Sequence, residues 1–248
     1  MVSIKIKDLL ALGTSNILAS AILGIFWLYL ASLLGKSEYG ELGFLMSVVN
    51  VGAAIALLGT RQMVPVFESK KMNVFYPSFI LVLISSNLTA LVSYIIFQNI
   101  FASFLIIGTA IFGILISGLE GKQRYRVVSN HTLFRTPIIV ALSLTFFYLL
   151  GMNGILLGYF IGSLFILKEL SYLIKNKKIE FSLIKQKISF MIHSYASRLL
   201  DVLVAWGDKI VIGILFGFIL LGDFYFAFQY FALIQTIPRA ISQYLVPQ

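Results

Sequence analysis

The stretch "RLLDVLVAWGDKIVIGILFG" (198–217) is apolar enough to form a membrane helix, yet it holds four charged residues. A charge near the centre of a bilayer costs at least about 2.5 kcal/mol on insertion scales. Such residues usually face the interior of a helix bundle or a water-filled cavity rather than lipid. This stretch therefore predicts a membrane protein with a polar interior, and the rest of the chain can be read for the other helices.

Composition agrees with a membrane protein and excludes several classes of chemistry. Of 248 residues, 59% are hydrophobic and 12% are charged, against about 25% charged residues in soluble domains. The chain has no cysteine and two histidines, which excludes disulfide frameworks and thiolate metal sites. No phosphate-binding loop, nucleophile elbow or HExxH motif occurs. We therefore expect no enzyme activity, no metal site and no nucleic-acid partner, with the net charge of +9 explained by membrane topology.

Long apolar runs predict an all-α polytopic membrane protein with about eight transmembrane helices. The first run follows a basic start and continues past the small residues Ala19-Ser20-Ala21 to Leu34, so it predicts a span rather than a cleaved signal peptide. Turn and charged residues separate the runs, as in the segments 60–73 and 97–101. The predicted spans are 9–34, 40–60, 75–97, 100–119, 127–150, 153–174, 190–216 and 223–246.

The basic residues predict the orientation of these spans. With loops alternating between the two sides, the side of the N-terminus holds all of the following: Lys5, Lys7, Arg61, Lys70, Lys71, Lys122, Arg124, Arg126, Lys168, Lys175, Lys177, Lys178, Lys185 and Lys187. The other side holds only Lys36. Because cytoplasmic loops are enriched in Lys and Arg, we expect a cytoplasmic N-terminus in a multi-pass protein of the plasma (inner) membrane.

An internal repeat relates the last two spans to the first two. At an offset of 182 residues, "LASLLGKSEYGELGF" (30–44) aligns with "IGILFGFILLGDFYF" (212–226), and both glycines of the turn coincide. An offset of six spans keeps the orientation, which predicts a parallel repeat. We expect a six-helix lobe at 1–174, a basic cytoplasmic linker at 175–189 and the start of a second lobe at 190–248. The chain would then be a fragment of a protein with about twelve spans, or a truncated gene product.

The segment "LLGKSEYGELGFLMSVVNVGAAIALLGT" (33–60) resembles the start of polysaccharide flippases of the MATE/MOP superfamily. The resemblance implies a two-lobe transporter that works by alternating access. It implies a cavity lined by spans 1, 2, 7 and 8. It also implies a substrate, a polyprenyl-pyrophosphate-linked oligosaccharide, which is moved to the outer leaflet for surface polysaccharide synthesis.

Four charged residues of the seventh span share an arc of about 100° on a helical wheel: Arg198, Asp201, Asp208 and Lys209. Two interpretations stand side by side. One is a structural ion-pair network, with Arg198–Asp201 and Asp201–Lys209 pairs. The other is a face that lines a watered cavity and binds an anionic headgroup.

Other polar residues extend the predicted substrate site. Arg239 follows Pro238, which can kink the eighth span and turn the arginine toward the cavity; alternatively, Arg239 snorkels to the surface. Asn16 and Ser20 share a face of the first span and are expected at the edge of the same cavity.

Two clusters are predicted near the cytoplasmic ends of the helices. Asn130, His131 and Arg135 suggest either an interfacial cluster with a snorkelling arginine or a phosphate or proton site. A cytoplasmic mouth either anchors the helices in the membrane or captures pyrophosphate, and its residues are Arg61, Lys122, Arg124 and Arg126. Glycines 154, 158 and 162, at four-residue spacing, predict close helix packing.

Two further functions remain open. One is a MATE-like exporter of small molecules, coupled to Na⁺ or H⁺; apart from such an ion no cofactor is expected. The other is a non-transporting scaffold that assembles with a glycosyltransferase or a polymerase. Intramembrane basic residues favour an anionic substrate over a cationic drug, and charge gathered on one face favours transport over a scaffold role.

Overall fold

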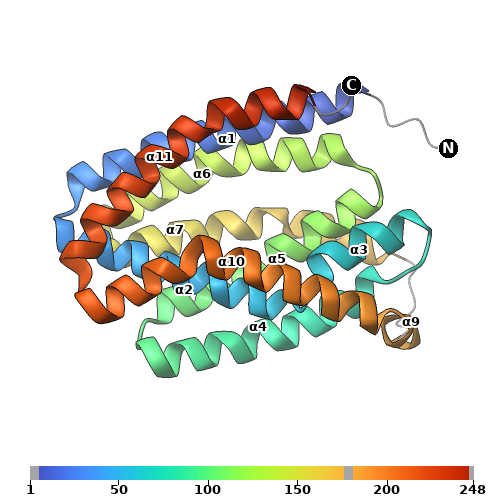
Figure 1. Ribbon diagram of the computed structural model, residues 1–248. Helices are drawn as coiled ribbons and strands as arrows, with labels where there is room; N and C mark the ends of the chain where they lie inside the picture. Colours follow the sequence, from blue (N-terminus) through green and yellow to red (C-terminus); the bar gives the residue numbers. More distant parts are fainter. Residues whose placement is uncertain (1–5, 176–180, 246–248) are drawn as a thin grey trace.

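The computed structural model describes residues 6–175 and 181–245, and the burial of side chains over 13–175 and 181–235 (Figure 1). Every regular element within these ranges is helical, which confirms the all-α prediction. The elements are α1 (Ile6–Leu33), α2 (Lys36–Leu57), α3 (Thr60–Ser69), α4 (Phe75–Phe97), α5 (Ile100–Gly121), α6 (Tyr125–Leu150), α7 (Met152–Leu164), the 3₁₀ helix η1 (Phe165–Glu169), α8 (Leu170–Ile174), α9 (Phe181–Gln186), α10 (Ile188–Phe216) and α11 (Phe218–Leu245).

The long helices make this a multi-pass membrane protein. Among the described residues, seven segments are long and apolar enough to cross a bilayer: 13–33, 36–57, 75–97, 100–121, 125–150, 152–174 and 218–235. The eighth long helix, α10, has 29 residues and is about 43 Å long at 1.5 Å per residue. It carries the four charged residues of the opening stretch. The predicted count of about eight membrane-length helices is confirmed.

The predicted loop at 60–73 is wrong over most of its length, because Thr60–Ser69 forms α3. Leu58 and Gly59 both adopt left-handed backbone conformations, with φ of 49° and 76°, and they end α2. The chain then restarts as a helix that buries Met63 and Phe67. The polar residues that suggested a loop are the outer face of this amphipathic helix.

The turns α1–α2, α4–α5, α6–α7 and α10–α11 gather at one end of the bundle (Figure 1). Asn99 caps α5 by accepting a hydrogen bond from the Ala102 amide at 2.9 Å, and it donates another to Asn153 at 2.9 Å. Lys36 forms an ion pair with Asp223 at 2.9 Å. We call this end the Lys36 end, and the opposite end, where α1 begins and α11 finishes, the basic end. The predicted break at 97–101 is confirmed.

Glycines bring α6 and α7 together. A Cβ atom at Gly158 would lie 2.5 Å from the Ser143 Cα atom, and a Cβ atom at Gly154 would overlap the Phe146 carbonyl. Ser143 also donates a hydrogen bond to the Ile155 carbonyl at 3.2 Å. The predicted packing role of this glycine series is confirmed, because only small residues permit such an approach.

The helix α11 crosses α2 at the Lys36 end with backbone against backbone. A Cβ atom at Gly40 would overlap the Phe218 carbonyl, and a Cβ atom at Gly222 would overlap the Lys36 carbonyl. At the repeat offset of 182 residues, position 36 aligns with 218 and position 40 aligns with 222. The contact of Gly40 with Phe218 is therefore the repeat counterpart of the contact of Gly222 with Lys36. Such reciprocity is the pattern that two copies of one helix pair produce around a pseudo-twofold axis.

Candidate functional site

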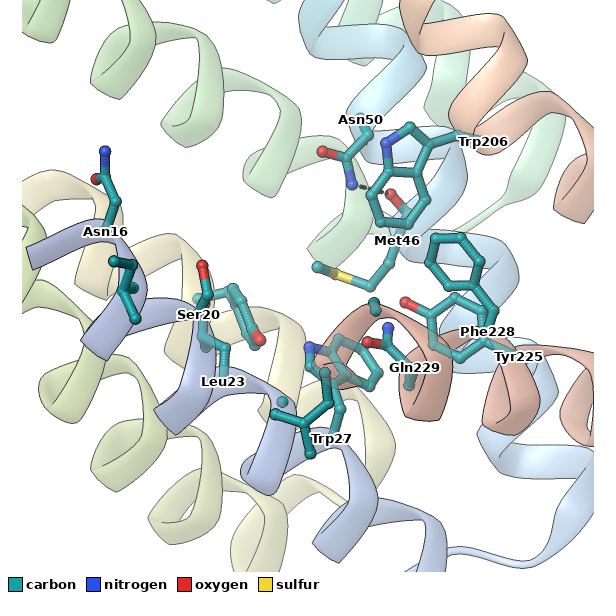
Figure 2. Close-up of a pocket in the computed structure, with 15 residues that line it drawn as sticks. Asn16, Ser20, Leu23, Trp27, Met46, Asn50, Trp206, Tyr225, Phe228 and Gln229 are labelled. Atoms are coloured by element: carbon teal, nitrogen blue, oxygen red, sulfur yellow. Dashed lines mark hydrogen bonds between the residues drawn. The ribbon is translucent and has the colours of Figure 1, made fainter. Parts of the chain in front are cut away.

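A cavity of about 500 Å³ lies among α1, α2, α7, α10 and α11 (Figure 2). It is closed toward the Lys36 end by the α2–α11 crossing, since Tyr225 follows Gly222 by less than one turn. From there it extends along α1 and α11 toward the basic end. Its polar and aromatic lining residues are Asn16, Ser20, Trp27, Asn50, Tyr159, Trp206, Tyr225, Phe228 and Gln229.

Three aromatic residues form the floor of this cavity, and we call them the aromatic floor: Trp27, Tyr159 and Tyr225. Tyr39 packs against Trp27 and Tyr225 without lining the cavity. The Trp27 ring centroid lies 5.4 Å from that of Tyr225 and 6.2 Å from those of Tyr39 and Tyr159. All three tyrosine hydroxyls are buried. Those of Tyr159 and Tyr225 interact with the side chains of Trp27 and Gln229, but not at the geometry of a well-formed hydrogen bond. An unmade hydrogen bond of this kind costs about 1–3 kcal/mol. The hydroxyls of Tyr159 and Tyr225, which line the cavity, therefore gain most from a ligand or water that supplies a partner.

Amide and hydroxyl groups complete the lining. Asn50 donates from Nδ2 to the Met46 carbonyl at 2.7 Å, which leaves its Oδ1 atom as an acceptor. Figure 2 shows Gln229 beside Tyr225, and Asn16 and Ser20 farther along the cavity. Among the described lining residues none is charged. The cavity therefore offers neutral donors and acceptors beside aromatic ring faces.

The predicted site residues are only partly brought together. Asn16 lines the cavity, as does its neighbour Ser20, whereas the four charged residues of α10 do not. Arg198 and Asp201 are exposed. The predicted Arg198–Asp201 and Asp201–Lys209 pairs are absent from the described part of the chain. Lys209 pairs with its neighbour Asp208 instead, at 2.9 Å. The side chain of Arg239 lies outside the described residues.

Lys209 is fully buried directly behind the cavity wall. Its Nζ atom donates to the Ala205 carbonyl at 2.8 Å and to Asp208 Oδ1 at 2.9 Å. The same atom lies 3.6 Å from the Phe228 ring centroid and 5.6 Å from that of Trp206. Cation–π contacts and two hydrogen bonds thus hold the ammonium group. Because Phe228 and Trp206 line the cavity, aromatic rings separate this cation from the cavity space.

The predicted mouth residues gather at the basic end, where most of them join helices. Arg61 makes hydrogen bonds to both Glu120 oxygens, at 2.9 and 3.3 Å. Lys122 donates to the Leu173 carbonyl at 3.3 Å, and Arg124 lies 3.5 Å from Glu169. Arg126 is exposed. Three of the four therefore have structural partners within the protein, a role that neither membrane anchoring nor pyrophosphate capture describes.

Sequence reasoning missed most of the lining. Asn50 and Gln229 are isolated amides within apolar runs, and this signal was available because a polar residue in a membrane helix usually faces a partner or a cavity. Trp27, Tyr159 and Tyr225 carried no such signal, since aromatic residues are common throughout the spans. Five helices supply the lining, and one helical wheel cannot show how they meet.

Comparison with known proteins yields no match among family models, curated proteins or solved structures. Function must therefore be inferred from the chemistry of the cavity.

Proposed function

We propose that this chain is a membrane transporter of the flippase type, which translocates lipid-linked oligosaccharide precursors by alternating access. The observation that carries the proposal is the neutral, amide- and aromatic-lined cavity between α1, α2, α10 and α11, to which α7 adds Tyr159. The helices α1, α2, α10 and α11 correspond to the four spans that the resemblance to MATE/MOP flippases implies, whereas α7 is an addition to them. The setting would be the plasma (inner) membrane, with a cytoplasmic N-terminus.

The lining suits a saccharide headgroup. Sugar hydroxyls pair with amide and hydroxyl groups such as those of Asn50, Gln229 and Ser20, which both donate and accept. The apolar faces of a sugar ring pack on aromatic faces such as that of Trp27. A volume of about 500 Å³ is in the range of small-molecule sites, so it would hold a sugar-sized headgroup while the polyprenyl tail remains in the bilayer.

The closed crossing at the Lys36 end supports an alternating-access mechanism. With a cytoplasmic basic end, the cavity would receive the headgroup from the cytoplasmic leaflet. Separation of α2 from α11 at Gly40 and Gly222 would then release it on the other side. The buried Lys209 supplies a cation behind Phe228 that an anionic pyrophosphate would meet if this ring turned aside.

An exporter of organic cations is the second candidate, and the aromatic floor favours it because cations bind aromatic faces. A cationic substrate would also be expected to meet a carboxylate, and no described lining residue is acidic. We therefore rank saccharide translocation first. Transport of ethidium, a planar organic cation, separates the two.

The test uses the full chain in liposomes that contain a fluorescent polyprenyl-pyrophosphate-linked oligosaccharide. A membrane-impermeant quencher reports how fast the headgroup changes leaflet. We expect protein-dependent flipping that is slowed by about tenfold in Asn50→Ala and Tyr225→Phe, since one lost hydrogen bond to a ligand is worth about 1.4 kcal/mol. Asn87→Ala is the matched control, because Asn87 makes the same bond to the carbonyl four residues earlier, at 2.8 Å, but on the exposed face of α4.

The outcomes are distinct. Flipping no faster than in protein-free liposomes would refute the proposal. Ethidium transport without flipping would favour the exporter, and the absence of both activities would favour a scaffold that works with a glycosyltransferase or a polymerase. Equal loss in Asn50→Ala and Asn87→Ala would show that the cavity is not the substrate site.

A further inference from the structure

A second cavity of about 320 Å³ lies among α5, α6, α7 and η1, and it shares no lining residue with the first. Its polar and charged lining residues are Asn130, His131, Arg135, Lys168 and Glu169. It opens near the basic end of α6, and none of the proposed saccharide contacts uses it.

Arg135 forms the base of this cavity. Its Nη2 atom donates to Ser163 Oγ at 2.8 Å, and its guanidinium carbon lies 4.0 Å from the Phe112 ring centroid. Its Nε atom is buried and has no hydrogen-bond partner among the described residues. The arginine is therefore held between α5 and α7 rather than snorkelling to the surface. Because Nε is buried, the terminal nitrogens of the guanidinium are the donors that a ligand in the cavity would meet, and only Nη2 has a partner among the described residues. A fixed guanidinium with free N–H groups matches the geometry of phosphate oxygens.

The charges around Arg135 leave the cavity positive. Glu169, its acidic residue, is engaged by His131 at 3.2 Å and by Arg124 at 3.5 Å. Lys168 is exposed, and its ammonium group has no partner in the described ranges. An anion in the cavity would thus meet Arg135 and Lys168. Glu169, the only carboxylate of the lining, is already engaged by Arg124 and His131.

The position of the cavity suits a lipid headgroup. At 1.5 Å per residue, Asn130 lies about 8 Å and Arg135 about 15 Å along α6 from its basic end. In a bilayer of about 40–45 Å with about 30 Å of hydrocarbon, this places Asn130 near the boundary between headgroups and acyl chains and Arg135 roughly 7–10 Å deeper, so a headgroup must enter the cavity to reach the guanidinium. Phe134 and Phe165 line the opening and are 69% and 51% exposed.

We propose that this cavity binds the phosphate group of an anionic phospholipid. Arg135 and Lys168 hold the phosphate oxygens, Asn130 donates to the headgroup, and the acyl chains lie against Phe134 and Phe165. The binding site is independent of the saccharide cavity and stands whether or not that cavity transports a saccharide. Its occupant would join α6 to η1 at the basic end of the bundle.

The test measures lipid binding to the full chain in neutral detergent by native mass spectrometry. Phosphatidylglycerol is titrated against zwitterionic phosphatidylcholine, and glycerol 3-phosphate is the soluble competitor. We expect phosphatidylglycerol to bind at least about fivefold more tightly than phosphatidylcholine. Lys168→Gln should remove about fivefold of this affinity, the effect of one basic residue at an anionic membrane surface. Lys71→Gln, an exposed lysine at the same end with no contact to the cavity, should leave it unchanged.

Arg135→Gln should weaken phosphatidylglycerol binding by about tenfold or more, because it removes charged hydrogen bonds. The melting temperature of this variant is measured in parallel. If the variant does not fold, Lys168→Gln and the comparison of phosphatidylglycerol with phosphatidylcholine still test the proposal. Equal affinity for the two lipids, or equal effects of Lys168→Gln and Lys71→Gln, would overturn the proposal. Displacement of phosphatidylglycerol by equimolar glycerol 3-phosphate would assign the cavity to a free phosphate and overturn the lipid assignment.

Discussion

Substitution of Gly40 by alanine should force α2 and α11 apart. The added Cβ atom would lie 2.8 Å from the Gly222 amide nitrogen and 2.9 Å from the Phe218 carbonyl carbon, whereas ordinary contact begins at 3.4 Å. Both obstacles are backbone atoms, so no side chain can rotate to make room. The Phe218 carbonyl oxygen lies closer still, so the helices must separate by roughly 1–1.5 Å, and strain of this kind in a packed interior costs about 1–3 kcal/mol.

The melting temperature in detergent, followed by circular dichroism, measures this cost. At about 2–4 °C per kcal/mol for a chain of this length, the expected decrease is roughly 2–12 °C. Gly222→Ala should give a decrease of similar size, because its Cβ atom would overlap the Lys36 carbonyl in the reciprocal contact. Gly207→Ala in α10 is the control. No atom lies within 4 Å of its added Cβ, and alanine in a helix is favoured over glycine by about 0.5–1 kcal/mol.

The reasoning fails if Gly40→Ala and Gly222→Ala melt at the temperature of the unsubstituted chain while Gly207→Ala behaves as expected. Such a result would mean that α2 and α11 do not touch through their backbones. The reciprocal contact would then offer no support for a pseudo-twofold relation between the two repeats.

Two further substitutions test the charged contacts. Asp208→Asn should lower the melting temperature by the equivalent of about 1–3 kcal/mol, because the buried ammonium of Lys209 loses its anionic partner. Adding Lys209→Met should recover most of the loss, and a double variant no more stable than Asp208→Asn alone would contradict this. Glu120→Gln should lower the free energy of unfolding by about 1 kcal/mol, because it weakens the half-buried pair with Arg61. The control Glu38→Gln changes an exposed carboxylate and should alter the free energy of unfolding by less than about 0.5 kcal/mol. Equal melting temperatures for these two variants would argue against the Arg61 contact.

The positions of the long helices were predictable because a membrane helix must satisfy its own backbone and be apolar over about 20 residues. Even the short turn at Gln98 and Asn99 followed from this requirement, and the structure shows Asn99 as a helix cap. The helix α3 did not follow, because it is short and amphipathic. Its start depends on the left-handed conformations of Leu58 and Gly59, and an apolar run does not encode them.

The partners of polar residues were harder to predict than the helices. A helical wheel placed Asp201 and Lys209 on one arc, yet the ammonium turns to Asp208 and to rings of α11. Rings from a neighbouring helix are not visible in the sequence of α10. Asn16 and Ser20 were expected at the cavity because they are polar residues on one face of a single helix. The positions of Trp27 and Tyr225 in the cavity depend on how several helices pack, and the sequence does not show this.

The α2–α11 crossing also has a kinetic consequence. Contacts between large side chains open only when several rotamers change together, and each ordered side chain carries its own entropy. At Gly40 and Gly222 there is no side chain to reorganise, so this end would open by a rigid-body separation of α2 from α11. Small residues at the contact also let the two helices slide over each other in small steps. The rate at which this end opens would then depend chiefly on the entry of lipid or water between the helices, so membrane composition would control how fast it opens.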